Sequence, residues 1–288
     1  MDLAGAQRSL EWRQHLLRRR LRELTARTPV VRTELRLLSA AGYPLAARIT
    51  RPDTAQATLP GVVISPAIHH GVAEVDTFAS AVTAAEVARL GYAVLTFDPA
   101  GRGDSWGEED FGGPEHQDDL RVAIRALMDA PDVSGVGVLS LSYGIVAAVP
   151  TLAHPVERGI DDRPVRWLLD WEGPSDREII TTGGTRLVPA AGHGLDDEDY
   201  WRPREPVRHI GALRCGYIRL QAWPDHAQPG ELRHAERMMD AVAKGTAPWF
   251  QINDHPRGTR PPRPNWLAPG PWSANVAILR KLSDLRGR

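Results

Sequence analysis

The stretch VGVLSLSYGIVAA, residues 136–148, decides the fold of this protein of 288 residues. An apolar run leads into Ser140-Leu141-Ser142-Tyr143-Gly144, and a second apolar segment follows. The centre reads S-x-S-x-G, close to the G-x-S-x-G turn that exposes a serine between a strand and a helix. The residues two positions before and two positions after such a serine must be small, because bulky ones would collide with the strand and the helix. The stretch therefore predicts a strand, a tight turn carrying Ser142 and a helix.

The segments on either side of this turn alternate between strands and helices. Apolar runs predict buried strands at 61–65, 92–97, 136–139, 165–169, 217–221 and 249–252. Helical spacing of apolar residues predicts helices at 77–90, 115–130, 230–243 and 273–285. Residues 32–50 predict two antiparallel strands joined by a turn that contains Gly42 and Pro44. This alternation is typical of an α/β protein with a mostly parallel central sheet and helices on both faces.

The domain organisation follows from where this alternation starts and where it is interrupted. Residues 1–30 contain a stretch with one apolar helical face, and we expect an N-terminal helix packed on the main domain. The main domain should span residues 31–288. Residues 176–210 fit the alternation badly and are rich in Gly, Pro and charged residues, so we interpret them as a small cap or lid insertion.

Composition and charge narrow the class of partner. Lysine and arginine number 35 and aspartate and glutamate 36, and a net charge of −1 gives no reason to expect binding to nucleic acid or an anionic membrane. Neither a secretory signal nor an apolar run of roughly 18 residues is visible. Cys215 is the only cysteine, so an intrachain disulfide is excluded. We expect a soluble, cytoplasmic protein that acts on a small molecule, with homo-oligomer formation left open.

A serine hydroxyl is a poor nucleophile without a base, so a histidine and an acid should follow Ser142. In a sheet of this kind the acid and the histidine each follow a later strand, in that order. Asp225 follows the strand at 217–221, and His255 follows the strand at 249–252. We therefore expect His255 to take the proton of Ser142 and Asp225 to orient His255.

Four other residues compete for these two roles. His226 adjoins Asp225, and His193 lies in the expected cap. Glu172 and Asp176 follow the strand at 165–169, where they could replace Asp225 as the acid. We interpret all four as polar surface or pocket residues.

An acyl-transfer site also needs donors for the oxyanion and a pocket for the substrate. The N–H of Tyr143, at the start of the predicted helix, is the expected first oxyanion donor. The second should come from the loop after the strand at 61–65, where Ala67 and Ile68 are the candidates and His70-Gly71 stays open. The side chains expected to line the substrate pocket are His69, His70, Trp171, Trp201 and Trp223.

Three motifs together resemble a known superfamily. They are F-D-x-x-G-x-G-x-S at 97–105, Ser142-Tyr143-Gly144 at the turn, and Tyr200-Trp201-x-Pro203-x-x-Pro206. From about residue 35 to 285 the chain resembles the α/β-hydrolase superfamily, within it the dienelactone hydrolase and prolyl-oligopeptidase-like branch. The resemblance implies an acyl-enzyme mechanism that needs no cofactor and no metal, with Asp98 and Arg102 bracing the loops around the site. The chain departs from the pattern at Ser140, where the family has glycine.

These observations favour a serine esterase that cleaves carboxylic esters of small or medium size. The cap is short and no segment would form a β-propeller, which argues against a protein substrate. A small-peptide peptidase or amidase would use the same three residues, and an acyltransferase would differ only in excluding water. A non-catalytic ligand-binding protein on the same fold is the alternative from another class.

Overall fold

The computed structural model describes residues 28–77, 80–155, 165–182, 193–227, 232–259, 266–267 and 271–287. The helix predicted within residues 1–30, at 9–27, lies outside these ranges. Within them, no helix is both long enough and apolar enough to cross a membrane.

An eight-stranded sheet forms the centre of the molecule, in the order β1-β2-β4-β3-β5-β6-β7-β8. β1 (Val30–Leu38) and β2 (Pro44–Pro52) form the antiparallel hairpin predicted from residues 32–50, and β2 pairs antiparallel with β4 (Ala93–Phe97). All other pairs are parallel and join β3 (Leu59–Ser65), β5 (Val133–Leu141), β6 (Trp167–Trp171), β7 (Gly216–Leu220) and β8 (Phe250–Ile252). The mostly parallel sheet expected from the sequence is confirmed.

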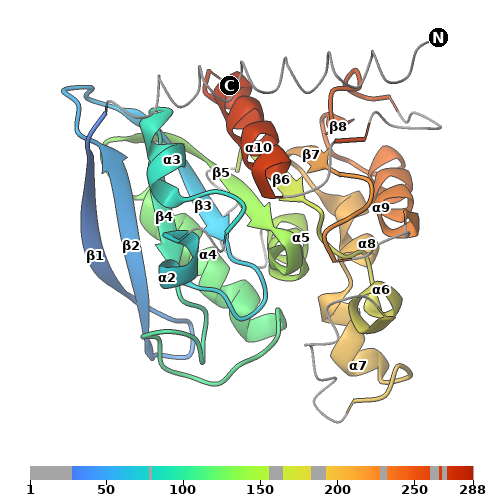
Figure 1. Ribbon diagram of the computed structural model, residues 1–288. Helices are drawn as coiled ribbons and strands as arrows, with labels where there is room; N and C mark the ends of the chain where they lie inside the picture. The colour runs from blue at the N-terminus through green and yellow to red at the C-terminus, as the bar shows by residue number, and fades with distance from the viewer. Residues whose placement is uncertain are drawn as a thin grey trace.

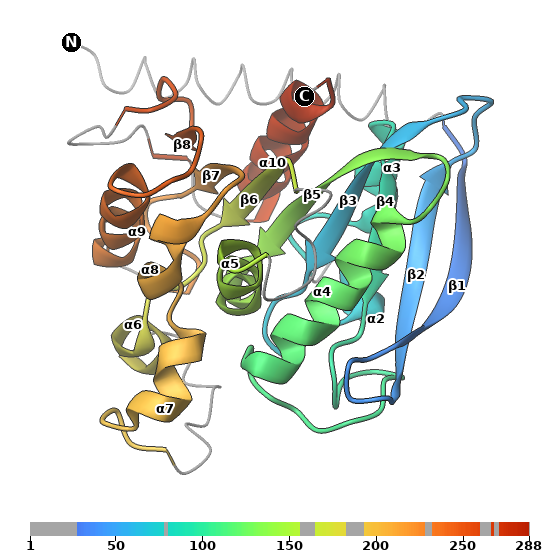
Figure 2. The ribbon, with the colours of Figure 1, turned by 180° about the vertical axis from the view of Figure 1, so that it is seen from behind.

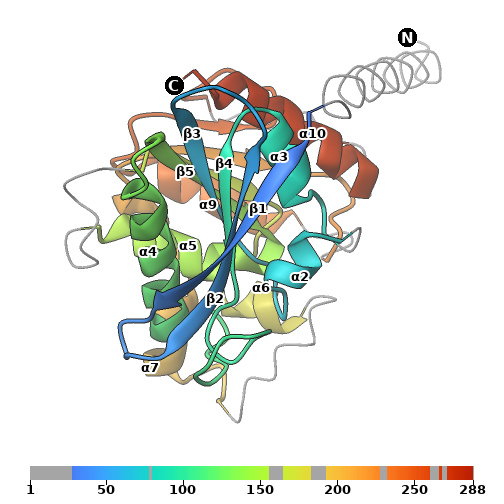
Figure 3. The same cartoon turned by 90° about the vertical axis from the view of Figure 1, so that its left-hand side faces the viewer.

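Helices cover both faces of the sheet, as Figures 1 and 3 show. One face carries α4 (Pro114–Met128), α5 (Ile145–Ala153) and α9 (Arg233–Ala243), and Figure 2 presents this side of the molecule. The other face carries α2 (Val72–Val75), α3 (Ala84–Arg89) and α10 (Pro271–Leu285). Each face has its own apolar cluster, because strands buried on both sides need a cover on both.

One helix is shorter than its apolar spacing predicted. The expected helix at 77–90 begins at Ala84, because Thr83 is an N-cap. The Thr83 hydroxyl accepts from the Glu86 N–H, and the Glu86 carboxylate accepts from the Thr83 N–H. This reciprocal capping box fixes the start of the helix at Ala84.

The pairing register brings three strand ends into one row. Leu141 of β5 lies opposite Trp171 of β6, and Trp171 lies opposite Leu220 of β7. The residues that leave these strands, Ser142, Glu172 and Gln221, therefore start from neighbouring points at one edge of the sheet. Such a meeting of carboxyl ends is where open α/β sheets form their sites.

The expected cap region contains short helical segments. They are α6 (Arg177–Thr182), α7 (Glu198–Trp201), η2 (Arg202–Arg204), α8 (Pro206–His209) and η3 (Ile210–Ala212). Trp201 is completely buried in the apolar cluster that includes α5, and its indole N–H donates to the Gly194 carbonyl at 2.8 Å. Trp201 is thus a core residue, and its expected place in the substrate pocket was wrong.

Candidate active site

Ser142 lies in the sharp turn that the sequence predicted. β5 ends at Leu141, a 3-10 turn η1 (Ser142–Gly144) follows, and α5 begins at Ile145. Ser142 has a φ of +51°, a left-handed conformation that an L-residue adopts rarely and at a cost in strain. Such strain recurs at functional sites, where the surrounding structure holds a side chain in one direction.

Gly144 and Ser140 satisfy the packing needs of this turn in different ways. A Cβ at Gly144 would lie 2.4 Å from the carbonyl oxygen of Ser65, so no side chain fits there. Ser65 Oγ also donates to the Gly144 carbonyl at 2.9 Å. Ser140, where the usual motif has glycine, is fully buried between its neighbours in β3 and β6. A small polar side chain is therefore tolerated at that position.

The side chain next to the Ser142 hydroxyl is that of His226. His226 Nε2 lies 2.9 Å from Ser142 Oγ, and His226 Nδ1 lies 2.6 Å from Glu172 Oε2. Glu172 itself is held by backbone donors, with its Oε1 accepting from the Ala222 N–H at 2.6 Å. Ser142, His226 and Glu172 thus form one hydrogen-bonded row.

The Glu172 carboxylate determines which His226 nitrogen carries the proton. A carboxylate can only accept, so Nδ1 must donate its hydrogen to Glu172. The lone pair of Nε2 then faces Ser142 and can accept the hydroxyl hydrogen. This is the tautomer that a general base for serine requires.

Aromatic stacking and charge tune the His226 ring. Trp171 stacks on it with ring centroids 4.5 Å apart and planes 20° from parallel, which fixes the plane of the imidazole. Burial alone would lower the pKa of His226. The hydrogen bond to Glu172 and the negative charges of Asp225 and Glu172 outweigh it, so the pKa lies above its ordinary value.

Two of the expected catalytic assignments therefore need correction. The ring at Ser142 belongs to His226, in the position expected for His255, which follows β8. The carboxylate closest to His226 Nδ1 is that of Glu172, whereas Asp225 Oδ1 lies 3.5 Å away. The physical reason is the aligned ends of β5, β6 and β7, which bring residues that follow β6 and β7 to the serine.

The other two candidates have different partners. His193 pairs with Asp197 at 2.5 Å, and its ring stacks on Tyr200. Asp176 accepts from Arg237 at 2.7 Å and from the Ser175 hydroxyl at 2.8 Å. These contacts give His193 and Asp176 a structural role, in which they hold neighbouring side chains in place.

Arg102 holds the loop that follows β3. The guanidinium donates to the Ala67 carbonyl at 3.1 Å and forms two hydrogen bonds with Glu109, at 2.7 and 2.8 Å. Asp98 accepts from the Val72 N–H at 2.6 Å and from the Asp104 N–H at 3.0 Å. Asp98 and Arg102 therefore brace the loops, as their motif implied. Ala67 and Ile68 are half-buried within the loop that they hold.

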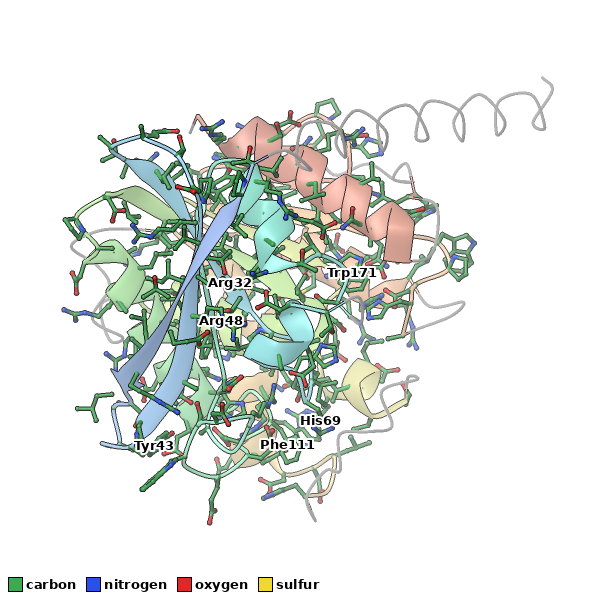
Figure 4. The ribbon with its side chains drawn as sticks, turned by 60° about the vertical axis from the view of Figure 1, so that its left-hand side comes forward. Arg32, Tyr43, Arg48, His69, Phe111 and Trp171 are labelled. Carbon is green, nitrogen blue, oxygen red and sulfur yellow. The ribbon has the colours of Figure 1, made fainter. Side chains whose placement is uncertain are left out.

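Phe111 and His69 form an aromatic wall beside that loop. Their rings meet edge to face with centroids 6.1 Å apart, and Figure 4 shows them side by side. Both residues have positive φ, +45° for Phe111 and +57° for His69. The Tyr143 hydroxyl donates to the Phe111 carbonyl at 2.9 Å, which ties this wall to the turn of Ser142.

The pocket residues expected from the sequence differ in how much of their surface is exposed. His69 and Trp223 are exposed, His70 and Trp171 are half-buried, and Trp171 lies against the ring of His226. These four keep surface that a ligand could reach, unlike Trp201.

One group of residues in the described part of the chain has the spacing of metal ligands. One ligand atom each from Glu172, Asp225 and His226 lies within 4.8 Å of the others. The same atoms already satisfy one another, since His226 Nδ1 donates to Glu172. We therefore interpret the group as a base with its carboxylates.

The sheet and the solved structures that the chain resembles define the class of fold. The protein has an eight-stranded, mostly parallel sheet with helices and the α/β-hydrolase fold. Residues 41–158 match the family model of X-Pro dipeptidyl-peptidase (S15 family). That match covers less than half of the chain. It includes Ser142 and ends before Glu172 and His226. No curated protein sequence matches the chain.

Three solved structures illustrate the similarity. The Pyrococcus furiosus esterase Pf2001 is 13% identical, with a TM-score of 0.57 over 87% of this chain and 92% of that one. Brefeldin A esterase, a bacterial homologue of human hormone-sensitive lipase, is 16% identical, with a TM-score of 0.60 over 91% and 76%. A puromycin-hydrolysing peptidase of Mycobacterium tuberculosis is 18% identical, with a TM-score of 0.62 over 87% and 37%. At these identities the likeness establishes the fold.

Proposed function

We propose that the protein is a serine hydrolase that cleaves carboxylic esters of small or medium size through an acyl-enzyme. Ser142 is the nucleophile, His226 the general base and Glu172 the acid that orients His226. The observation that carries this proposal is the hydrogen-bonded row of Ser142 Oγ, His226 and Glu172, with distances of 2.9 and 2.6 Å. A hydroxyl, an imidazole and a carboxylate in this order are the working parts of serine hydrolases on unrelated folds.

The proton of the Ser142 hydroxyl moves to the imidazole of His226 and does not move on to Glu172. As Ser142 Oγ attacks the acyl carbon, its hydrogen moves to His226 Nε2, and the charged ring is stabilised by Glu172. His226 then protonates the leaving alcohol. Water then attacks the acyl-enzyme and gives a proton to His226. The acid product is released as His226 returns that proton to Ser142 Oγ. The Tyr143 N–H and an N–H of Ala67 or Ile68 would stabilise the oxyanion.

Two features favour an ester over a protein substrate. The chain covers 92% and 76% of the two esterases but only 37% of the peptidase, so it matches the esterases over most of their length. The half-buried ring of Trp171, stacked on His226, offers an aromatic surface that a small acyl group could contact. We also propose that the described residues 193–210 cap the site, since Arg204 pairs with Asp110 next to Phe111.

Hydrolysis of matched chromogenic substrates tests the substrate class. We expect turnover of p-nitrophenyl acetate and butyrate and labelling by a fluorophosphonate probe, because the activated serine attacks an acyl or phosphonyl centre. The match to the X-Pro dipeptidyl-peptidase family makes a small-peptide peptidase the second candidate. Faster cleavage of an Ala-Pro p-nitroanilide than of the butyrate ester would replace the esterase by that peptidase. The absence of both turnover and labelling would refute the hydrolase.

The pH profile should reflect the raised pKa of His226. A general base works when neutral, so kcat/KM should fall as pH drops through the pKa of the free enzyme. Because that pKa is raised, the midpoint of the fall should lie above the ordinary histidine value of about 6.5. Measuring kcat/KM for p-nitrophenyl butyrate from pH 5 to pH 9 checks this. A midpoint below the ordinary value would contradict it.

A further inference from the structure

The Nδ1 atom of His226 faces two carboxylates from neighbouring strands. Glu172, which directly follows β6, lies at 2.6 Å, and Asp225, in the segment after β7, lies at 3.5 Å. The proposed reaction needs only one of them. Asp225 is nonetheless buried, with 3% of its surface exposed. A carboxylate is stable in such a position only when hydrogen bonds or charges compensate for the loss of contact with water.

Asp225 has several such compensating donors. The Gln221 side-chain amide donates to Oδ2 at 2.7 Å, and the Ala227 N–H donates to Oδ1 at 2.7 Å. His234 Nε2, from α9, lies 3.4 Å from Oδ2. Burial would raise the pKa of Asp225, but His234, His226 and Gln221 together hold it well below its ordinary range. Asp225 is therefore ionised when the site works.

His234 connects Asp225 to a second buried ion pair. Its Nδ1 lies 3.1 Å from the Arg219 guanidinium, which pairs with Asp170 at 2.6 Å. His234, Arg219 and Asp170 are all completely buried. His234 Nδ1 also lies 3.2 Å from the Gly173 carbonyl, so the ring is held between β7 and the segment that follows β6. His234 therefore lies in a fixed position behind Asp225, while Oδ1 of Asp225 faces His226.

We propose that Asp225 is a second positioning residue for the catalytic base, so that His226 works with two carboxylates in parallel and His234 holds the second one in place. This inference rests on the proposed function of Ser142 and His226. The hydrogen of Nδ1 stays on the ring throughout, and neither carboxylate takes a proton. Both lower the free energy of the imidazolium that forms when Ser142 attacks.

The charged and titratable groups around His226 set the direction of the expected effects. Glu172 and Asp225 favour the protonated ring, and Arg219, further back in β7, opposes it. Removing either carboxylate while keeping its shape should therefore lower the pKa of His226. The remaining carboxylate should preserve part of the rate, which a single acid could not do.

A double-mutant cycle tests whether Glu172 and Asp225 both stabilise the protonated His226. Loss of the only acid of a serine triad costs about 10⁴-fold in rate. With Asp225 still present, we expect Glu172→Gln to cost only about 10²-fold in kcat. Asp225→Asn should cost about 10-fold, with KM unchanged, and the double variant about 10⁴-fold. The loss in the double variant would thus exceed the product of the single losses.

A readout that does not depend on activity separates this inference from the proposed function. NMR titration of the His226 ring in Asp225→Asn should show a pKa lowered by about 1 in a protein that remains folded. His234→Gln should lower the rate less than Asp225→Asn. An unmoved His226 pKa, or a loss in Glu172→Gln as large as in the double variant, would overturn the inference. A shifted pKa in a protein that hydrolyses nothing would instead refute the proposed function.

Discussion

Replacing Ser142 by alanine should lower kcat for p-nitrophenyl butyrate by about 10⁶-fold and abolish labelling by a fluorophosphonate probe. The hydroxyl oxygen is the only heavy atom removed, and it is the atom that His226 Nε2 contacts at 2.9 Å. Alanine keeps the backbone of the turn, so Tm should change little. Steady-state rates, probe labelling followed by mass spectrometry and thermal unfolding measure the three quantities.

Ser140→Ala provides a matched control two residues away. Ser140 is fully buried at the first small position of the same turn, and its Oγ has no hydrogen-bond partner among the residues that the structure describes. Removing this hydroxyl should therefore leave kcat within a few-fold of the wild type, because no hydrogen bond is lost. Activity or labelling that persists in Ser142→Ala would assign the nucleophile to another residue.

The second large effect separates the two histidines that the sequence offered. His226→Ala should lower kcat by about 10⁶-fold, because the base and the nucleophile of a triad act as one unit. His255→Ala should leave kcat within a few-fold, since the ring at Ser142 is that of His226. The comparison uses p-nitrophenyl butyrate at saturating concentration, with Tm measured for both variants.

The same pair of variants also tests the geometry against the usual strand order. In that order the base follows β8, where His255 lies. A large loss in His255→Ala combined with an active His226→Ala would show that the base comes from β8 and would overturn the assignment of Glu172 as well.

The residues of the proposed triad were visible in the sequence, but the roles that the structure suggests for them were not. Glu172 directly follows a buried strand and His226 adjoins Asp225, and both were considered as alternatives. The expected order placed the acid after β7 and the base after β8, whereas the hydrogen-bonded row uses residues after β6 and β7. Glu172 has a φ of +51°, the same value as Ser142. This turn of the backbone, which directs the side chain toward the histidine, has no simple signature in a sequence.

The amino-acid sequence by itself determined the class of fold and the turn of Ser142. Continuous apolar strands, helical spacing between them and small residues around one serine are local properties, and local sterics and burial translate them directly into strands, helices and a sharp turn. Only the tertiary structure decided which histidine and which carboxylate meet that serine. Their meeting depends on the pairing register of β5, β6 and β7 and on the paths of the connecting loops. The tertiary structure also distinguishes Trp201, which is buried in the core, from Trp171, which stacks on His226. Such long-range contacts are set by how whole elements pack, and the spacing of residues along the chain does not contain them.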